Sequence, residues 1–105
     1  MIREIQAQHK LWSLKNFGTV PPKDMLLGIV EEVGELAHAH LKESQNIRMN
    51  EDHKQKQIDA VGDIAIYLIG YCNSRDLDLQ SIIVDVWNDV KQRDWRKYPE
   101  NGRTK

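Results

Sequence analysis

Apolar residues recur every three to four positions along most of the chain, which is the spacing of one face of an α-helix. Residues that interrupt helices divide this pattern into four segments. We expect the first helix at Ile2–Phe17, ended by Gly18, and the second from Pro22 to about Ser44. A glycine after a helix and a proline in its first turn are typical of these positions.

A polar stretch at residues 45–51 separates the second segment from a third, which we expect to end near Ser74. Asp78 can cap a fourth helix that continues towards Tyr98. Few alternating β-branched runs suggest strands. We therefore predict an all-α four-helix bundle, in a single domain that spans residues 1–105.

The third segment is apolar almost all the way round between Ile58 and Cys72, and such a helix is normally buried. Its only charges in that window are Asp59 and Asp63, which lie one turn apart on the same face. Unpaired aspartates are rarely buried, so we expect something to balance their charge.

The second segment has a broad apolar face with acidic residues on its flank. The face consists of Leu26, Ile29, Val30, Val33, Leu36 and Ala37. Glu32 borders this face and Glu35 follows one turn later on the same flank, whereas Glu31 points further towards solvent. Gly34 and Gly62 each precede an acid inside a helix, where glycine costs about 1 kcal/mol, and close approach of another helix explains both.

If these two helices pack together, four carboxylates crowd one region: Glu32, Glu35, Asp59 and Asp63. Helix axes lie about 8–10 Å apart, and a like-charged pair at about 4 Å costs about 4 kcal/mol at an effective dielectric near 20. Protonation, basic partners or a cation must relieve the repulsion. An all-oxygen cluster without cysteine selects a hard ion, so we expect Mg²⁺, with Mn²⁺ as an alternative.

Composition indicates a soluble globular protein. Charged residues make up 30% and apolar residues 40% of the chain, with a net charge of -1, so we expect no general affinity for nucleic acid. No apolar run approaches the ~20 residues of a membrane span, and the first residues lack a signal-peptide core, so we expect a cytoplasmic protein. A chain of 105 residues buries little of its own surface, which suggests a homodimer or homotetramer.

Two acidic elements occur in order on neighbouring predicted helices. They are Glu31-Glu32-Val33-Gly34-Glu35 and Asp59-Ala60-Val61-Gly62-Asp63. This arrangement resembles the EExxE and ExxD elements of the MazG-like nucleoside triphosphate pyrophosphohydrolases, which belong to the all-α NTP pyrophosphatase superfamily. The resemblance extends to residues 12–18 and 87–95, and therefore covers most of the chain.

The resemblance implies hydrolysis of a nucleoside triphosphate between the α and β phosphates, which gives a monophosphate and pyrophosphate. The metal ligands that it implies are Glu32, Glu35, Asp59 and Asp63, and the catalytic residues are Glu31, Glu32 and Glu35. Strict ExxD places glutamate at position 60, where this chain has Ala60, so the role passes to Asp59, which shares a face with Asp63. Glu31 can orient a ligand, act as a base or remain solvated.

The same resemblance implies substrate contacts near both ends of the chain, from Trp12, Lys15, Asn16, Phe17, Lys91 and Arg93. Most of these residues also have a role that needs no substrate. Aromatic residues at a helix end more often pack in a core than stack on a base. Cations near a helix C-terminus are favoured by the helix dipole alone.

Two other functions fit the sequence. One is a dUTP- or dCTP-specific pyrophosphatase, because related all-α enzymes use a similar acidic site. The other is a non-catalytic helical interaction module, whose acids bind a structural cation or a basic partner. Turnover of a triphosphate separates the enzymes from the module.

Overall fold

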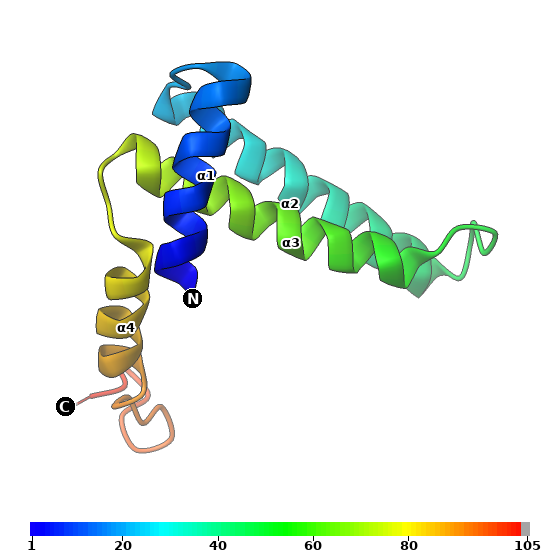
Figure 1. Ribbon diagram of the computed structural model, residues 1–105. Helices are drawn as coiled ribbons and strands as arrows, with labels where there is room; N and C mark the ends of the chain where they lie inside the picture. Colours follow the sequence, from blue (N-terminus) through cyan, green and yellow to red (C-terminus); the bar gives the residue numbers. More distant parts are fainter. Residues whose placement is uncertain (104–105) are drawn as a thin grey trace.

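The computed structural model describes residues 1–103 and contains four helices and no strand within that range (Figure 1). The helices are α1 (Ile2–Phe17), α2 (Pro22–Gln45), α3 (His53–Ser74) and α4 (Leu79–Val90). The all-α prediction is confirmed, and so are the bounds of the first helix. No helix within residues 1–103 combines the length and the apolar character that a membrane-spanning segment needs.

Local chemistry explains where α1 ends and where α2 and α3 begin. Gly18 follows α1 with φ 69°, a backbone conformation that suits glycine, and its N–H donates to the carbonyl of Leu14. Pro22 occupies the first position of α2, where a missing N–H costs nothing. Asp52 caps α3 by accepting a hydrogen bond from the backbone N–H of Gln55 at 3.0 Å.

The fourth helix is shorter than predicted. It ends at Val90, whereas the sequence pattern indicated helix as far as Tyr98. The carboxylate of Asp94 accepts hydrogen bonds from the backbone N–H groups of Arg96 and Lys97 at 3.1 and 3.0 Å. A side-chain hydrogen-bonded turn thus occupies residues 94–97, where the sequence pattern predicted helix.

Residues 91–103 instead form a closed loop that we call the C-terminal hook. The backbone N–H of Asp94 donates to the carbonyl of Gly102 at 2.6 Å. Asp89, in the last turn of α4, accepts hydrogen bonds from Arg93 at 2.9 Å and also from Arg103. These two guanidinium groups hold the pKa of the Asp89 carboxyl below its usual range, with the Arg93 hydrogen bond as the largest cause.

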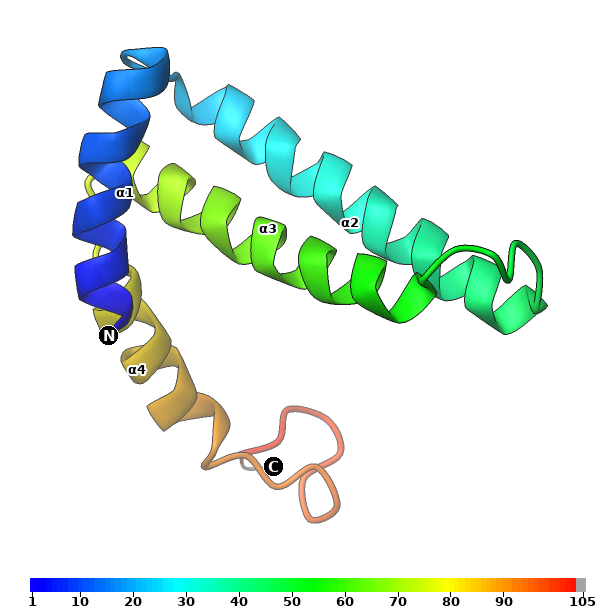
Figure 2. The ribbon, with the colours of Figure 1, turned by 45° about the vertical axis from the view of Figure 1, so that its right-hand side comes forward.

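The two long helices α2 and α3 run antiparallel and form a hairpin (Figure 2). Small residues and polar residues form more of this contact than large apolar residues do. Gly28 of α2 lies directly against the ring of Tyr67 on α3, and a Cβ atom at this glycine would lie 2.2 Å from the ring. Ala39 and Ala60 are buried in the same hairpin.

Helix α1 crosses the C-terminal end of α3 and also contacts α4. The side chain of Gln6 joins these elements: its Nε2 donates to Asn73 Oδ1 at 3.0 Å and to the Leu77 carbonyl at 2.7 Å, and its Oε1 accepts from the N–H of Leu79 at 3.0 Å. Gln6 is buried, so a fully satisfied amide fixes the position of α1.

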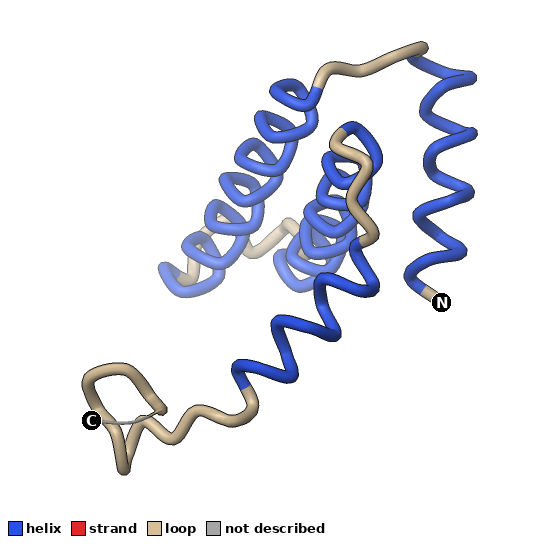
Figure 3. Tube along the Cα trace, turned by 90° about the vertical axis from the view of Figure 1, so that its left-hand side faces the viewer, coloured by secondary structure: helices blue, strands red, loops and turns tan. Residues whose placement is uncertain are grey.

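The four helices do not close into a bundle within one copy. Helix α4 and the hook extend away from the hairpin (Figure 3). The radius of gyration is 17.6 Å, against about 13 Å for a compact chain of this length. The accessible surface is 8105 Å², about 2,000 Å² more than a compact protein of 12.3 kDa exposes.

The prediction that α3 is buried on all sides is wrong for a single copy, because Ile58 and Val61 are more than half exposed. Only the side of α3 towards α2 and the end crossed by α1 are covered. The exposed apolar residues on one flank of the hairpin are Leu26, Val33, Val61 and Leu68, and we call this surface the apolar face.

Candidate active site

Glu32 lies inside the contact between α2 and α3. The sequence placed it at the border of the broad apolar face of α2, and the side chain is only 9% exposed and points towards α3. The reason is that the flank of α2 that carries Glu32 packs against α3, whereas Leu26, Val30 and Val33 remain exposed to solvent. Within the described part of the chain, Glu32 Oε2 has no hydrogen-bond partner.

Glu32 is also surrounded by negative charge. Burial raises the pKa of its carboxyl above the usual value, and the carboxylates of Glu35, Asp63 and Glu31 raise it further, in that order. A buried carboxylate without a partner is costly, because its charge is neither solvated nor paired. This residue therefore marks the place where the fold most needs a proton or a cation.

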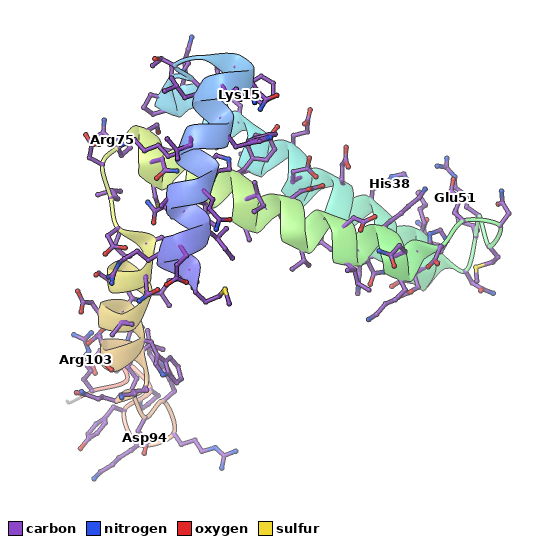
Figure 4. All side chains as sticks on the ribbon, in the orientation of Figure 1. Lys15, His38, Glu51, Arg75, Asp94 and Arg103 are labelled. Atoms are coloured by element: carbon purple, nitrogen blue, oxygen red, sulfur yellow. The ribbon has the colours of Figure 1, made fainter. Side chains whose placement is uncertain are left out.

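Next to Glu32, the two helices form a depression of about 700 Å³ that we call the acidic groove. Its acidic lining consists of Glu31, Glu35, Asp59 and Asp63. Figure 4 shows the labelled His38, which also lines the groove, on the hairpin towards its free end. The structure therefore brings the four predicted metal ligands to one flank of the hairpin, with Glu32 between the helices and the others at the groove.

Asp59 belongs to this groove but is engaged locally. Its Oδ1 accepts a hydrogen bond from Gln55 Nε2 at 2.9 Å. The nearby Lys56 pairs with Glu51 at 3.0 Å and not with Asp59. Thus the position of Asp59 is compatible with the predicted role as a metal ligand in place of a glutamate at position 60, which stays a prediction.

The carboxylates do not yet converge on a common point: in residues 1–103, no three His, Cys, Asp or Glu side chains are close enough together to hold a metal ion. Mutual repulsion favours this spread arrangement. The donor set nevertheless fits Mg²⁺, because it consists of carboxylate oxygens and includes the unpartnered Glu32 Oε2.

The two helix glycines beside the site are not explained by packing within this copy. A Cβ atom at Gly34 or at Gly62 would meet nothing within 4 Å. The prediction of close helix approach is therefore wrong for these two positions in one copy. Gly34 lines the acidic groove, so its missing side chain leaves room there for a ligand.

The predicted substrate residues of α1 do not line the acidic groove. Trp12 and Phe17 are more than half exposed and pack edge to face, with ring centroids 5.6 Å apart. Asn16 donates a hydrogen bond to the Trp12 carbonyl at 2.8 Å, and Lys15 is exposed in the last turn. Neither of the two aromatic residues is packed in a core, and neither is placed at the acids.

Lys91 and Arg93 lie on the opposite arm of the molecule from the acids. In Figure 4, the labelled Asp94 and Arg103 of the hook are at the far end from His38. Arg93 is committed to Asp89 through an ion pair at 2.9 Å. Lys91 is exposed and has no ion-pair partner among residues 1–103. One copy therefore does not bring these cations to the acidic groove.

A second pocket, which the sequence pattern did not predict, lies between α1 and the C-terminal end of α3. Its polar lining residues are His9, Lys10, Ser13, Thr19, Asn73 and Ser74. The spacing of Gln6, His9 and Ser13 was the available signal, because three polar residues on one face of a helix can point inward only where other elements supply polar contacts.

Comparisons of the chain with family models, with curated proteins and with solved structures find no match. The residues and geometry of the chain itself therefore carry the functional argument.

Proposed function

We propose that the protein is a Mg²⁺-dependent, MazG-like nucleoside triphosphate pyrophosphohydrolase. The observation that carries this proposal is Glu32, a buried carboxylate with one unpartnered oxygen, among the carboxylates of Glu31, Glu35 and Asp63. The two-part acidic motif of residues 31–35 and 59–63 supports the same function.

A cation explains the cluster better than a basic residue of the same copy. Among residues 1–103, no lysine or arginine forms an ion pair with Glu32, Glu35, Asp59 or Asp63. Lys56 lines the groove but pairs with Glu51. An oxygen-only ligand set then favours Mg²⁺, with Mn²⁺ as a close substitute.

In this proposal Glu32, Glu35 and Asp63 hold the ion, and Asp59 supplies the fourth carboxylate. When bound, Mg²⁺ offsets the charge of the triphosphate oxygens. Glu31 is exposed at the rim of the groove, so it is placed to take a proton from water. The water oxygen bonds to the α-phosphorus, the bond from that phosphorus to the bridging oxygen breaks, and pyrophosphate leaves.

The proposal includes a homo-oligomer, either a dimer or a tetramer. The excess surface of about 2,000 Å² per chain exceeds the roughly 800 Å² that each partner buries in a standard interface. A second copy on the apolar face covers Val33 and Val61. The same assembly delivers the free Lys91 of one copy to the acidic groove of its neighbour, where it neutralises phosphate charge.

A non-catalytic interaction module is the second candidate, and the exposed apolar face favours it. In that case the acidic groove binds the basic hook of another copy, without turnover. Oligomerisation alone does not separate the two functions, because both require it. Product formation does.

The test is a screen of the common ribo- and deoxyribonucleoside triphosphates with Mg²⁺ and with Mn²⁺, in which the products are separated by ion exchange. The proposal expects equal amounts of monophosphate and pyrophosphate, and no reaction in EDTA. Release of orthophosphate only, or the absence of turnover from a protein that binds Mg²⁺, would contradict it. Asp63→Asn is the matched inactive variant, and Asp24→Asn, on the first turn of α2, is its control.

A further inference from the structure

The start of α4 is held by a side chain of α1, which lies beside it (Figure 1). Leu79 is the first residue of α4, so its N–H has no partner within the helix, and the side chain of Asp78 makes no capping hydrogen bond. Gln6, which precedes Leu79 by 73 residues, accepts this N–H through its Oε1 at 3.0 Å. A buried amide of α1 therefore fixes the direction in which α4 leaves α3.

Backbone groups determine which atoms donate and which accept in this network. The Leu79 N–H can only donate and the Leu77 carbonyl can only accept, so the oxygen and the nitrogen of the Gln6 amide are assigned unambiguously. Gln6 Nε2 then donates to Asn73 Oδ1, and Asn73 Nδ2 donates to the Gln6 carbonyl, both at 3.0 Å. If the Asn73 amide turned over, donor would face donor and acceptor would face acceptor. Asn73 Nδ2 is thus held as a donor.

This donor also faces His9. The distance from Asn73 Nδ2 to His9 Nδ1 is 3.5 Å, which is long for a hydrogen bond, and at this distance only an acceptor is favourable. The ring of His9 lies against the backbone of α3, because a Cβ atom at Gly70 would lie 3.0 Å from His9 Cε1. Trp12 packs beside the ring at a centroid distance of 5.7 Å. The network therefore suits a neutral ring with its proton on Nε2, whereas a protonated ring would point an Nδ1–H at another donor.

The surroundings of His9 offer no negative charge to a protonated ring. Among the described residues that line its pocket, the only charged one is Lys10, on its own helix. The residues that α2 and α3 place there are uncharged, namely Met25, Gly70, Asn73 and Ser74. Burial lowers the pKa of the His9 imidazole. The stability that the neutral ring contributes is therefore complete above the usual histidine pKa of about 6.5, and is lost as the pH falls below it.

The other charged groups at this corner do not titrate in the same range of pH. Arg3, Asp76 and Asp78 lie on the far side of Gln6. Arg3 pairs with Asp78 at 2.6 Å, and its hydrogen bond is the largest cause that holds the pKa of the Asp78 carboxyl below its usual range. Aspartate and arginine side chains keep their charge above about pH 5. Among these groups, only His9 changes its charge between about pH 5 and about pH 7.5.

We infer that His9 is a pH-sensitive latch: the neutral ring holds α1 against α3, and uptake of a proton displaces the ring from Asn73, loosens the Gln6 network and releases the start of α4. Asn73 cannot turn away from the proton without losing both of its hydrogen bonds to Gln6. Either the ring leaves its place or the pair of amides opens, and both weaken the contact of α1 with α3. The latch requires neither a metal ion nor a triphosphate.

The position of the ring proton gives the first test. Long-range ¹H–¹⁵N correlation spectra of the full chain at about pH 7.5 should show the His9 proton on Nε2, and a titration should give a midpoint below that of a histidine in an unfolded peptide. A proton on Nδ1, or a midpoint at or above the value in the unfolded peptide, would overturn the inference.

Hydrogen exchange at Leu79 tests the release of α4. Between about pH 7.5 and about pH 5, the protection factor of the Leu79 amide should fall by at least about threefold, because its acceptor on Gln6 is loosened. The amide of Ile64, in the middle of α3, is the internal reference and should keep its protection. Constant protection at Leu79, or an equal loss at Ile64, would contradict a local latch.

A variant without a titrating ring should remove this dependence on pH. His9→Asn keeps an acceptor near the position of Nδ1 and takes up no proton, so Leu79 should be equally protected at both pH values. His40→Asn, at an exposed position of α2, is the matched control and should retain the wild-type loss of protection. The same loss in His9→Asn as in the wild type would refute the role of His9.

A change of charge at Asn73 should invert the latch. Asn73→Asp replaces the donor with a carboxylate, which attracts the protonated ring, so the midpoint of the His9 titration should rise above that of the wild type. Leu79 in this variant should be better protected at about pH 5 than at about pH 7.5. Asn88→Asp, at an exposed position in the last turn of α4, adds the same charge elsewhere and should leave the midpoint unchanged. A midpoint in Asn73→Asp no higher than in the wild type would show that Asn73 does not control the charge of His9.

Discussion

The hairpin of α2 and α3 and the arm made of α4 and the hook differ in charge and in packing. Residues 22–74 contain nine acidic and five basic residues, whereas the arm, residues 79–103, contains five basic and four acidic ones, and all five basic residues lie in the hook. The hairpin has an extensive internal contact, and the arm touches the rest of the chain chiefly through α1. Two oppositely charged regions that do not meet in one copy are well suited to meet between copies.

The hairpin and the arm each leave apolar side chains exposed. The hairpin shows its acidic groove on one flank and its apolar face on the other. The arm exposes Ile83, Val86 and Trp87 of a strongly amphipathic helix. Both regions thus carry apolar surface that a soluble monomer rarely leaves open, and assembly would cover it.

A charge on the apolar face should have the largest effect. Val33→Lys keeps α2 helical, because lysine is the better helix former, but places an unpaired cation in the proposed interface. We expect association to weaken by at least about 100-fold, with loss of turnover at concentrations where the variant is monomeric. Sedimentation velocity across a concentration series measures this change.

The control is Gln8→Lys, which adds the same charge at an exposed polar position of α1 and should leave the mass unchanged. A wild type that is monomeric and active at micromolar concentration would contradict the claim that the hairpin of one copy meets the arm of another.

The next largest effect concerns the internal contact of the hairpin. Gly28→Ala forces a methyl group into the ring of Tyr67, so the free energy of unfolding should fall by about 2 kcal/mol despite the gain in helix propensity. Gly34→Ala is the matched control: its Cβ meets nothing within 4 Å, and the free energy of unfolding should rise by about 1 kcal/mol. Urea unfolding at one fixed protein concentration tests both, and equal effects at the two positions would show that α2 and α3 do not pack as described.

A smaller effect is expected from Glu32→Gln in the absence of metal. The folded-state pKa of Glu32 is raised, so its contribution to stability is present below the usual glutamate pKa and is lost as the pH rises through the folded value. The Tm of the variant should therefore exceed that of the wild type in EDTA, by a margin that grows from about pH 4 to about pH 7.

Mg²⁺ should raise the Tm of the wild type more than that of Glu32→Gln. Glu43→Gln, on the exposed last turn of α2, is the control and should show no such dependence. A constant difference in Tm between wild type and Glu32→Gln at all pH values would contradict the raised folded-state pKa of this carboxyl.

Much of the fold could be predicted from local signals. Gly18 predicted the end of α1 and Pro22 the start of α2, because the backbone preferences of these residues act within one helical turn. The common flank of Asp59 and Asp63 followed from a spacing of four residues, and the structure places both in one groove. The hook could not be predicted from periodicity, because the turn at Asp94 replaces helical hydrogen bonds with side-chain ones.

The remaining differences between the sequence predictions and the structure depend on which faces of the helices pack together. The sequence pattern identifies the apolar side of α2, but within one copy α3 packs against the flank that includes Gly28 and Glu32. The pocket at Gly70 requires α1 to cross α3 near His9, a contact between residues far apart in the sequence that no helical period encodes. The polar spacing of Gln6, His9 and Ser13 indicates an inward face on α1, but it does not tell which helix that face meets.

The most direct test of the central claim, that the acids of one copy and the arm of another complete one site, uses two inactive variants. Asp63→Asn loses a groove carboxylate and Lys91→Ala loses one of the cations of the arm that form no ion pair among residues 1–103. Mixed pairs of the two variants are isolated by co-expression with different affinity tags, and their release of pyrophosphate is measured beside that of the wild type. We expect about half the wild-type rate, because one of the two symmetric sites then has intact acids from one copy and an intact lysine from the other. A rate no higher than that of either variant alone would contradict the claim.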